Sequence, residues 1–355
     1  MTRTDSAGRR SFVIRSSQGR RQPVFSVRVD LRLLVVCVGL IGATIGVLLV
    51  ALSVGDFHIA VGDVVATLAG GGTPQAQLVV GEWRLPRALL GIVLGAALGM
   101  SGSIFQSLTR NPLGSPDIIG FSTGAYTGGL VVILVFGGGY LPTALGAVVG
   151  GLLTAVLVYA LAYRHGIQGF RLIIVGIGVS ATLASVNSWL VTRANLDDAL
   201  QAALWGSGSL NGLGYTQLWP VLGLLVIVCP VLLAHTPALR QLELGDDSAR
   251  ALGVRAEAIR LSSLLWGIVL VAIATAAAGP IAFIALVAPQ ISRRLLGTAA
   301  LAPIPAAFAG GLLLLSSDLV AQRAFAPTQL PVGVMTVIVG GGYFVWLLVR
   351  EGRRR

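Results

Sequence analysis

Long, almost uninterrupted apolar runs recur along the whole chain. Each has about 18 residues or more, enough for a helix to cross a bilayer core of roughly 30 Å. The apolar residues are continuous and do not alternate with polar ones, so the pattern favours helices over the strands of a membrane barrel. Ten spans are predicted, at residues 33–54, 85–108, 117–136, 141–163, 172–192, 216–235, 262–279, 280–297, 303–322 and 330–349.

Composition agrees with this pattern. Only 11% of the residues are charged and the mean hydropathy is +0.86, whereas soluble domains carry about 25% charged residues. We therefore predict an all-α polytopic protein of the cytoplasmic (inner) membrane with about ten transmembrane helices. Short surface helices are expected at 57–70 and within 193–214, the second ending at Gly206.

The distribution of charge predicts the topology. All 25 basic residues are arginines. With the N-terminus inside, 21 of them fall on the cytoplasmic side, and only Arg84, Arg87, Arg193 and Arg323 fall on the other. This asymmetry follows the positive-inside rule and places both termini in the cytoplasm. The net charge of +11 therefore reflects insertion in a lipid bilayer, and no nucleic-acid partner is expected.

This topology divides the chain into three parts. Residues 1–32 are predicted to be a disordered basic cytoplasmic tail, residues 33–350 a ten-helix transmembrane domain, and residues 351–355 a basic cytoplasmic C-terminus.

The sequence offers no catalytic, metal or cofactor site. No phosphate-binding loop is present, and without lysine none could be, so any ATPase must be another chain. Cys37 and Cys229 are expected to be apolar packing residues. His58, His165 and His235 lie outside mid-membrane depth, so none can serve as the base for the G-x-S-x-G pattern at 120–124.

Helix-breaking residues cluster at 110–125, "RNPLGSPDIIGFSTGA", between two apolar runs. We interpret this stretch as a cytoplasmic turn that leads into a closely packed helix, because small residues let helices approach one another. The turn and packing residues are Asn111, Pro112, Gly114, Pro116, Gly120 and Gly124.

Ionisable residues within spans are few. Asp117 begins the third span and Asp318 lies deep in the ninth. Such residues are functional candidates because their burial is costly. We expect Asp318 to pair with nearby Arg323 or to cap a helix break, and the scarcity of carboxylates argues against an ion-coupled carrier.

Arg84 and Arg87 flank a rigid Leu-Pro on the arginine-poor side of the membrane, at the start of the second span. Interfacial snorkelling explains one such residue. Two fixed guanidinium groups are better explained as a docking point for an acidic partner.

The cytoplasmic segment "TPALRQLELGDDSARALGVRAEAIRL" (236–261) predicts a short charged helix. Asp246 or Asp247 can cap its start, and Gly253 can end it in the left-handed conformation. A solvated connector is the alternative reading.

Four blocks together resemble the permeases of ABC importers for iron-siderophores and vitamin B12. They are "RLPRALLGIVLGAALGMSGSIFQSLTRNPLGSPDIIGFSTGA" (84–125), "LELGDDSARALGV" (242–254), "GPIAFIALVAPQISRRLLG" (279–297) and "DLVAQRAFAPTQLPVGVMTVIVGG" (318–341). The resemblance covers residues 33–350, with the blocks in family order. They look most like the branch of this family that imports catecholate siderophores.

The resemblance implies the fold, the partners and a role. Such a permease has ten helices, pairs with a second homologous permease, and is driven by separate ABC ATPase subunits. A heterodimer is favoured over a homodimer. An extracytoplasmic siderophore-binding protein delivers the ligand, here a ferric siderophore of the catecholate type. The alternatives are heme or a cobalamin as substrate, or an ion-coupled secondary transporter.

The resemblance also assigns residues. Arg84 and Arg87 would dock the binding protein. A third family arginine aligns with Gln322, so its neighbour Arg323 is the candidate for that contact. A cytoplasmic constriction corresponds to Gly169-Phe170. The coupling segment at 240–257 would contact the ATPase through Leu244, Gly245, Asp246, Asp247, Ala249 and Gly253.

Overall fold

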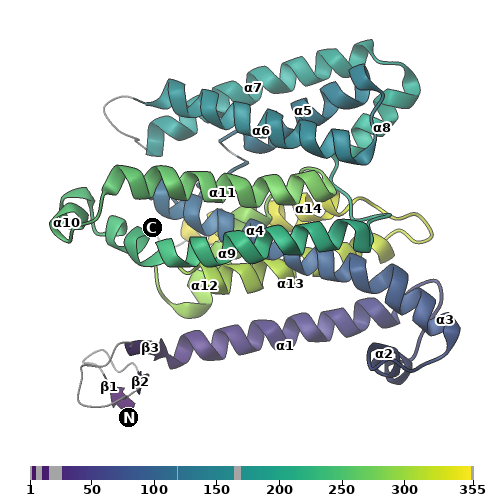
Figure 1. Ribbon diagram of the computed structural model, residues 1–355, viewed down its shortest axis with the longest axis horizontal. Helices are drawn as coiled ribbons and strands as arrows, with labels where there is room; N and C mark the ends of the chain where they lie inside the picture. Colours follow the sequence, from purple (N-terminus) through teal and green to yellow (C-terminus); the bar gives the residue numbers. More distant parts are fainter. Residues whose placement is uncertain (1, 5–9, 16–25, 118, 164–168, 353–355) are drawn as a thin grey trace.

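The computed structural model describes residues 2–4, 10–15, 26–117, 119–163 and 169–352 (Figure 1). Its long helices are α1 (Leu31–Ser53), α4 (Leu85–Thr109), α5 (Phe121–Phe136), α6 (Tyr140–Ala162), α7 (Gly169–Arg193), α9 (Tyr215–Glu243), α11 (Ala256–Ala278), α12 (Ile284–Leu296), α13 (Pro303–Arg323) and α14 (Val332–Gly352). Between them lie the short helices α2 (Val61–Leu68), α3 (Pro74–Ala76), α8 (Leu196–Gly206) and α10 (Asp246–Ala251), and the π-helical segment η1 (Gln77–Arg84).

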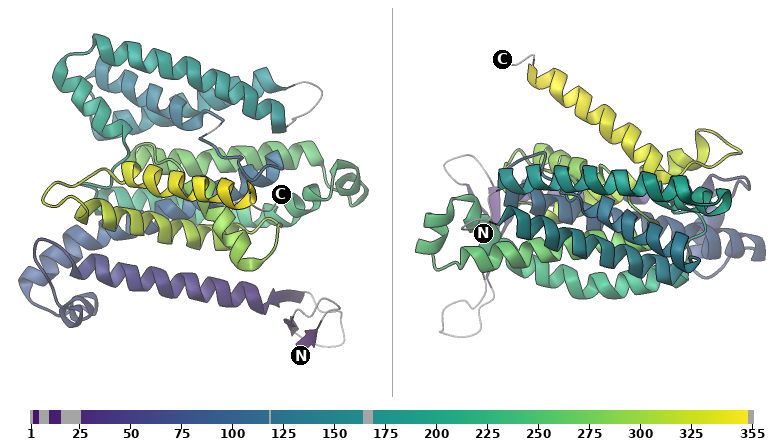
Figure 2. Two further views of the ribbon diagram at one scale, coloured as in Figure 1. Left: turned by 180° about the vertical axis from the view of Figure 1, so that it is seen from behind. Right: turned by 90° about the horizontal axis from the view of Figure 1, so that it is seen from above.

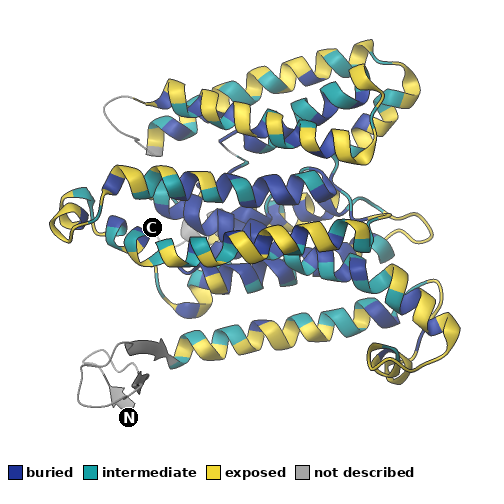
Figure 3. Cartoon of the chain, in the orientation of Figure 1, coloured by how far each residue is buried: buried dark blue, intermediate teal, exposed yellow. Residues whose placement is uncertain are grey.

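Helix α4 lies in the middle of the bundle, beside α9, α11, α12 and α13 (Figure 1). Helices α5 to α8 form a layer on one side of this group, and α1 runs along the opposite side (Figure 2). Buried residues concentrate in α4, α11, α12 and α13, whereas α1 and α7 are largely exposed (Figure 3). Helices α2, α3 and α8 lie at one end of the bundle, here called the α2 end, and α10 lies at the other, the α10 end.

Seven helices in the described part of the chain are long and apolar enough to cross a membrane. Two shorter apolar helices, Phe121–Phe136 and Val332–Trp346, add to them. The prediction of an all-α polytopic membrane protein is confirmed, while the count of ten spans stays a prediction. Helix α8 ends at Gly206, as expected.

The predicted span at 280–297 is shorter in the structure. The backbone leaves the helix at Gly279, with φ of 74°, and takes φ of 69° at Phe283, so α12 begins only at Ile284. Pro280 contributes to this break because proline has no N–H to donate. The preceding helix, α11, extends in the other direction and begins at Ala256.

The predicted disorder of the N-terminal tail, residues 1–32, stays a prediction. The described part of this tail has secondary structure. It contains three short strands, β1 (Thr2–Thr4), β2 (Arg10–Arg15) and β3 (Ser26–Asp30), paired antiparallel in the order β1-β2-β3. The sequences of β2 and β3, RSFVIR and SVRVD, contain the β-branched and aromatic residues that favour strands. Helix α1 then begins at Leu31.

Glycines let α4 lie directly against α12 and α13. A Cβ atom at Gly95 would collide with the backbone of Gly310, and one at Gly102 would collide with the carbonyl of Ala285. Gly310 meets the backbone of Gly95 in the same way from the α13 side. Membrane helices commonly use small residues for such close contact. These contacts fix how α4 and α13 lie against each other along their lengths.

We predict that Gly102→Ala destabilises the protein because the added methyl group would force α4 away from α12. Overpacking of this kind costs about 1–3 kcal/mol. The control is Gly42→Ala on α1, where a Cβ atom would meet nothing within 4 Å. Thermal unfolding of the detergent-solubilised protein should show a lower midpoint for Gly102→Ala only. Equal midpoints for the two variants would contradict the close approach.

Candidate docking and coupling sites

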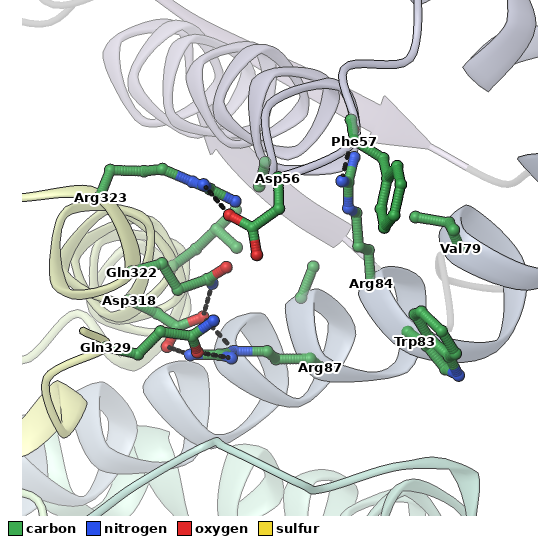
Figure 4. A pocket seen from close by; sticks show the side chains of 13 residues that line it. Asp56, Phe57, Val79, Trp83, Arg84, Arg87, Asp318, Gln322, Arg323 and Gln329 are labelled. Atoms are coloured by element: carbon green, nitrogen blue, oxygen red, sulfur yellow. Dashed lines mark hydrogen bonds and ion pairs between the residues drawn. The ribbon is translucent and has the colours of Figure 1, made fainter. Parts of the chain in front are cut away.

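Three arginines surround one pocket at the α2 end of the bundle (Figure 4). The cavity measures about 190 Å³. Arg84 comes from η1, Arg87 from the start of α4 and Arg323 from the last residue of α13. The pocket is also lined by Asp56 and Asp318, so its charged residues carry a net positive charge. The structure therefore brings together all three arginines that the sequence predicts for docking.

Arg84 bonds to backbone carbonyls around the end of α1. Its Nη1 donates to the carbonyl oxygen of Leu52 at 2.7 Å and to that of Ser53 at 3.3 Å, and its Nη2 donates to that of Phe57 at 2.7 Å. A cation here also suits the partial negative charge of a helix C-terminus. A Cβ atom at Gly55 would collide with the guanidinium, so only glycine leaves room for this contact.

Arg87 forms a buried ion pair with Asp318. Its Nε and Nη2 donate to the two carboxylate oxygens at 2.9 and 2.8 Å, and the side chains of Arg87 and Asp318 are only 14% and 2% exposed. Gln322 Nε2 donates to the same carboxylate at 2.8 Å, and Arg87 Nη1 donates to Gln329 Oε1 at 3.1 Å. The expectation that Asp318 pairs with Arg323 is therefore wrong, because α13 presents this carboxylate to α4.

Arg323 has a more exposed partner. Its Nη1 donates to Asp56 Oδ1 at 3.1 Å, in a pair whose side chains are 27% and 76% exposed, and its Nη2 donates to the Val54 carbonyl at 3.4 Å. Gln322, which aligns with the third family arginine, bonds Asp318 instead. No sequence pattern pointed to Asp56, because its partner Arg323 lies 267 residues away in the chain.

We predict that Arg87→Leu and Asp318→Leu each destabilise the protein, because either change leaves a buried charge without its partner. Such a loss costs about 3–5 kcal/mol, whereas replacing both members of a buried pair is often nearly neutral. The double variant should therefore unfold at a midpoint close to that of the wild type. A double variant as unstable as the sum of the two single variants would show that the pair is not an energetic unit.

Helix α10 projects from the α10 end between α9 and α11 (Figure 1). Asp246 does not cap it, because the cap position is Gly245 and the Asp246 carboxylate binds elsewhere. Its Oδ1 accepts from Arg260 Nη2 at 2.6 Å and from Arg110 Nη2 at 2.9 Å. Gly253, with φ of 84°, follows the helix in the left-handed conformation, as expected.

The charge partners of Asp246 lower its pKa. The largest cause is the hydrogen bond from Arg260, with Arg110 adding to it. Because the folded-state pKa lies below the ordinary value of 3.8, the stabilisation is complete above pH 3.8 and is lost only as pH falls through the lowered pKa. The segment is therefore held in place throughout the physiological range.

The residues of the coupling segment divide into buried and exposed groups. Ala249 is fully buried and packs in a cluster with Leu239, Leu242, Ala256 and Leu301. Leu244 and Leu252 are 68% and 61% exposed, and the Asp247 side chain is fully exposed. Ala249 thus belongs to the core of the segment, and the exposed leucines form its free apolar surface.

The breaker-rich turn ties this segment to the bundle. Arg110, with φ of 49°, ends α4 and donates to the Leu242 carbonyl at 3.0 Å as well as to Asp246. Asn111 Oδ1 accepts from the Leu113 N–H at 2.9 Å, and the Pro112 carbonyl accepts from Gln290 Nε2 at 2.9 Å. The Pro116 carbonyl accepts from the Phe121 N–H at 3.2 Å. The turn is therefore anchored to both α9 and α12.

The glycines of the turn and of the start of α5 are closely surrounded by other residues. Gly120 takes φ of 92°, and a Cβ atom there would lie 2.5 Å from Ser180 Oγ. One at Gly124 would collide with Thr154, and one at Gly114 with Thr109. Ser122, the serine of the G-x-S-x-G pattern, donates to Asp117 and not to a histidine. This environment suits packing and offers no activated nucleophile.

The last residues singled out from the sequence are those of the predicted cytoplasmic constriction and the two cysteines. Gly169 begins α7 and Phe170 is 77% exposed, while residues 164–168 before them lie outside the described residues. Cys229 lies beside Met100, with 3.9 Å between the sulfur atoms, and Cys37 is likewise a free thiol. Within the described ranges, no cluster of three histidine, cysteine or acidic side chains could hold a metal ion.

Residues 35–350 match the model of the FecCD transport family, and the chain belongs to that family. It is therefore a permease, with no catalytic activity of its own.

The chain is similar to several curated permeases. It is 49% identical over 329 residues to the ferric enterobactin transport system permease protein FepG of Escherichia coli (strain K12), covering 93% of this chain and 100% of that one. It is 35% identical to the iron(3+)-hydroxamate permease FhuG of Bacillus subtilis (strain 168), covering 86% and 93%. It is 36% identical to the hemin permease HmuU of Yersinia pestis, covering 77% and 83%.

The fold resembles a solved transporter. A structure of an inward-facing conformation of a metal-chelate type ABC transporter superposes with a TM-score of 0.79 at 26% identity, covering 89% of this chain and 99% of that one.

Proposed function

We propose that this chain is the permease subunit of an ABC importer that carries a ferric siderophore of the catecholate type into the cytoplasm. The observation that carries the proposal is the 49% identity to a ferric enterobactin permease along that protein's entire length. Identity to the hydroxamate and hemin permeases is lower. Heme or a cobalamin is the second candidate within the same machine.

We infer that ten helices cross the membrane with the α2 end outside and the α10 end in the cytoplasm. The arginine distribution supports this orientation, because Arg84, Arg87 and Arg323 lie at the α2 end while Arg110, Arg250 and Arg260 lie at the α10 end. The chain would pair with a second, homologous permease, and a heterodimer is favoured. The pocket arginines would then meet an extracytoplasmic binding protein, and α10 would meet the ATPase.

Ion-coupled transport is less well supported. A coupled carrier needs a carboxylate that can exchange its proton or ion during transport. Asp318 is held by Arg87 and Gln322, and Asp117 accepts hydrogen bonds from Ser122 and from the backbone of Phe283. Both buried carboxylates therefore have structural partners.

Uptake measurements test the substrate and the energy source. With the complete importer reconstituted in vesicles, we expect ferric enterobactin to enter only when ATP is supplied on the ATPase side. Hemin should enter at least tenfold more slowly, and a proton gradient alone should drive nothing. Uptake driven by a proton gradient alone would support a secondary transporter. Faster uptake of hemin than of ferric enterobactin would show that the proposed substrate is wrong.

The exposed leucines of the coupling segment provide a second test. The double variant Leu244→Ala/Leu252→Ala removes apolar surface that would contact the ATPase, and it should lower transport at least tenfold. The permease should keep its thermal stability, since both side chains are mainly exposed. The control is Leu295→Ala, an exposed leucine of α12 outside the segment. If the double variant transports like the wild type, the segment 240–257 is only a connector between α9 and α11.

A further inference from the structure

The three arginines of the docking pocket differ in how deeply they are buried and in which partners they bind. Arg87 is almost buried, donates two hydrogen bonds to Asp318, and has Gln329 as a third partner. Moving Arg87 toward another protein would leave the Asp318 charge unpaired in a buried site, which is strongly unfavourable. Arg87 therefore cannot exchange its partner easily.

Arg84 is engaged differently. Its acceptors are three backbone carbonyls at the end of α1, which are neutral groups. The guanidinium therefore keeps its full positive charge while its N–H groups are occupied. It contributes to the positive field of the pocket without needing to leave its place.

Arg323 has the only partner in this pocket that another carboxylate can replace directly. Asp56 lies on the connection between α1 and α2, its side chain is largely exposed, and it accepts a single hydrogen bond from Arg323. Exposed ion pairs of this type are weak and are screened by salt. A carboxylate from a partner protein offers the same chemistry at the same guanidinium.

The charge balance favours that exchange. With Asp56 in place, two aspartates offset the three arginines of the pocket. When Asp56 moves away, Arg84 and Arg323 have no carboxylate left among the pocket residues, because Asp318 is bound to Arg87. An acidic group of a partner then restores the lost neutralisation, and complementary charge of this kind favours association.

We propose that Arg323 is the arginine that an acidic residue of the external binding protein takes over, and that Asp56 occupies it until then as an internal competitor. Arg87, by contrast, keeps Asp318 as its partner, and this buried pair joins α4 to α13. This inference rests on the proposed function, since it specifies which arginine of the docking pocket binds the external protein and which residue occupies that arginine beforehand.

The first experiment measures binding of the importer's own external binding protein, purified without ligand, to the complete importer in lipid nanodiscs. Asp56→Asn removes the competing charge with little change in shape. We expect it to tighten binding about two- to fivefold, the range that an exposed pair can contribute. The gain should disappear in high salt. Asp63→Asn, an exposed aspartate of α2 with the same loss of charge, is the matched control and should leave binding unchanged.

A double-mutant cycle identifies the arginine involved. Arg323→Gln should weaken binding, and Asp56→Asn should have no further effect in the Arg323→Gln background. If Asp56→Asn leaves the affinity unchanged or weakens it, or if its effect persists without Arg323, the competition is overturned.

The outcomes also separate this inference from the proposed function. If the wild-type importer binds no external protein, the proposed function and the competition fail together. If the wild type binds and Asp56→Asn behaves like Asp63→Asn, only the competition fails.

Discussion

The close contact of α4 with α12 and α13 is the constraint on which the rest of the structure depends. Glycines at 95, 102 and 310 bring the backbones together without intervening side chains. These helices are in contact along their lengths, so the packing fixes their positions relative to one another. It therefore also determines which residues come into contact at each end of the bundle. At the α2 end it places Arg87 against Asp318. At the α10 end it places the turn after α4 against Asp246 and α12.

The two ends are built from different kinds of interaction, and this suits different tasks. The α2 end combines a buried ion pair, Arg87 with Asp318, and a more exposed one, Arg323 with Asp56. At the α10 end, Asp246 is held by two arginines and Ala249 is buried, so the segment is attached firmly to the bundle. The segment is thus attached to the bundle while Leu244 and Leu252 stay exposed, which is what the proposed contact with an ATPase requires.

Much of this arrangement could be predicted from local sequence. The arginines of "RLPR" are three residues apart at the start of a helix, so they must lie near each other. Gly253 marked the end of α10 correctly. The partners could not be predicted in this way. Asp318 was expected to bind Arg323, five residues on, and instead binds Arg87 across the bundle. The pairing of Asp56 with Arg323 could not be predicted, because an exposed aspartate in the loop between α1 and α2 belongs to no recognisable sequence pattern.

By itself, the sequence determined that the chain is a helical membrane protein, which of its loops carry positive charge, and which family it belongs to. These properties depend on composition, on the order of residues within short segments and on sequence motifs. The bilayer constrains the first two, and common ancestry preserves the motifs. The tertiary structure alone decided which charges are paired, which of these pairs is buried, and which residues of the coupling segment are exposed. Such contacts join residues far apart in the sequence, and they exist only once the backbones of α4 and α13 have met in one alignment.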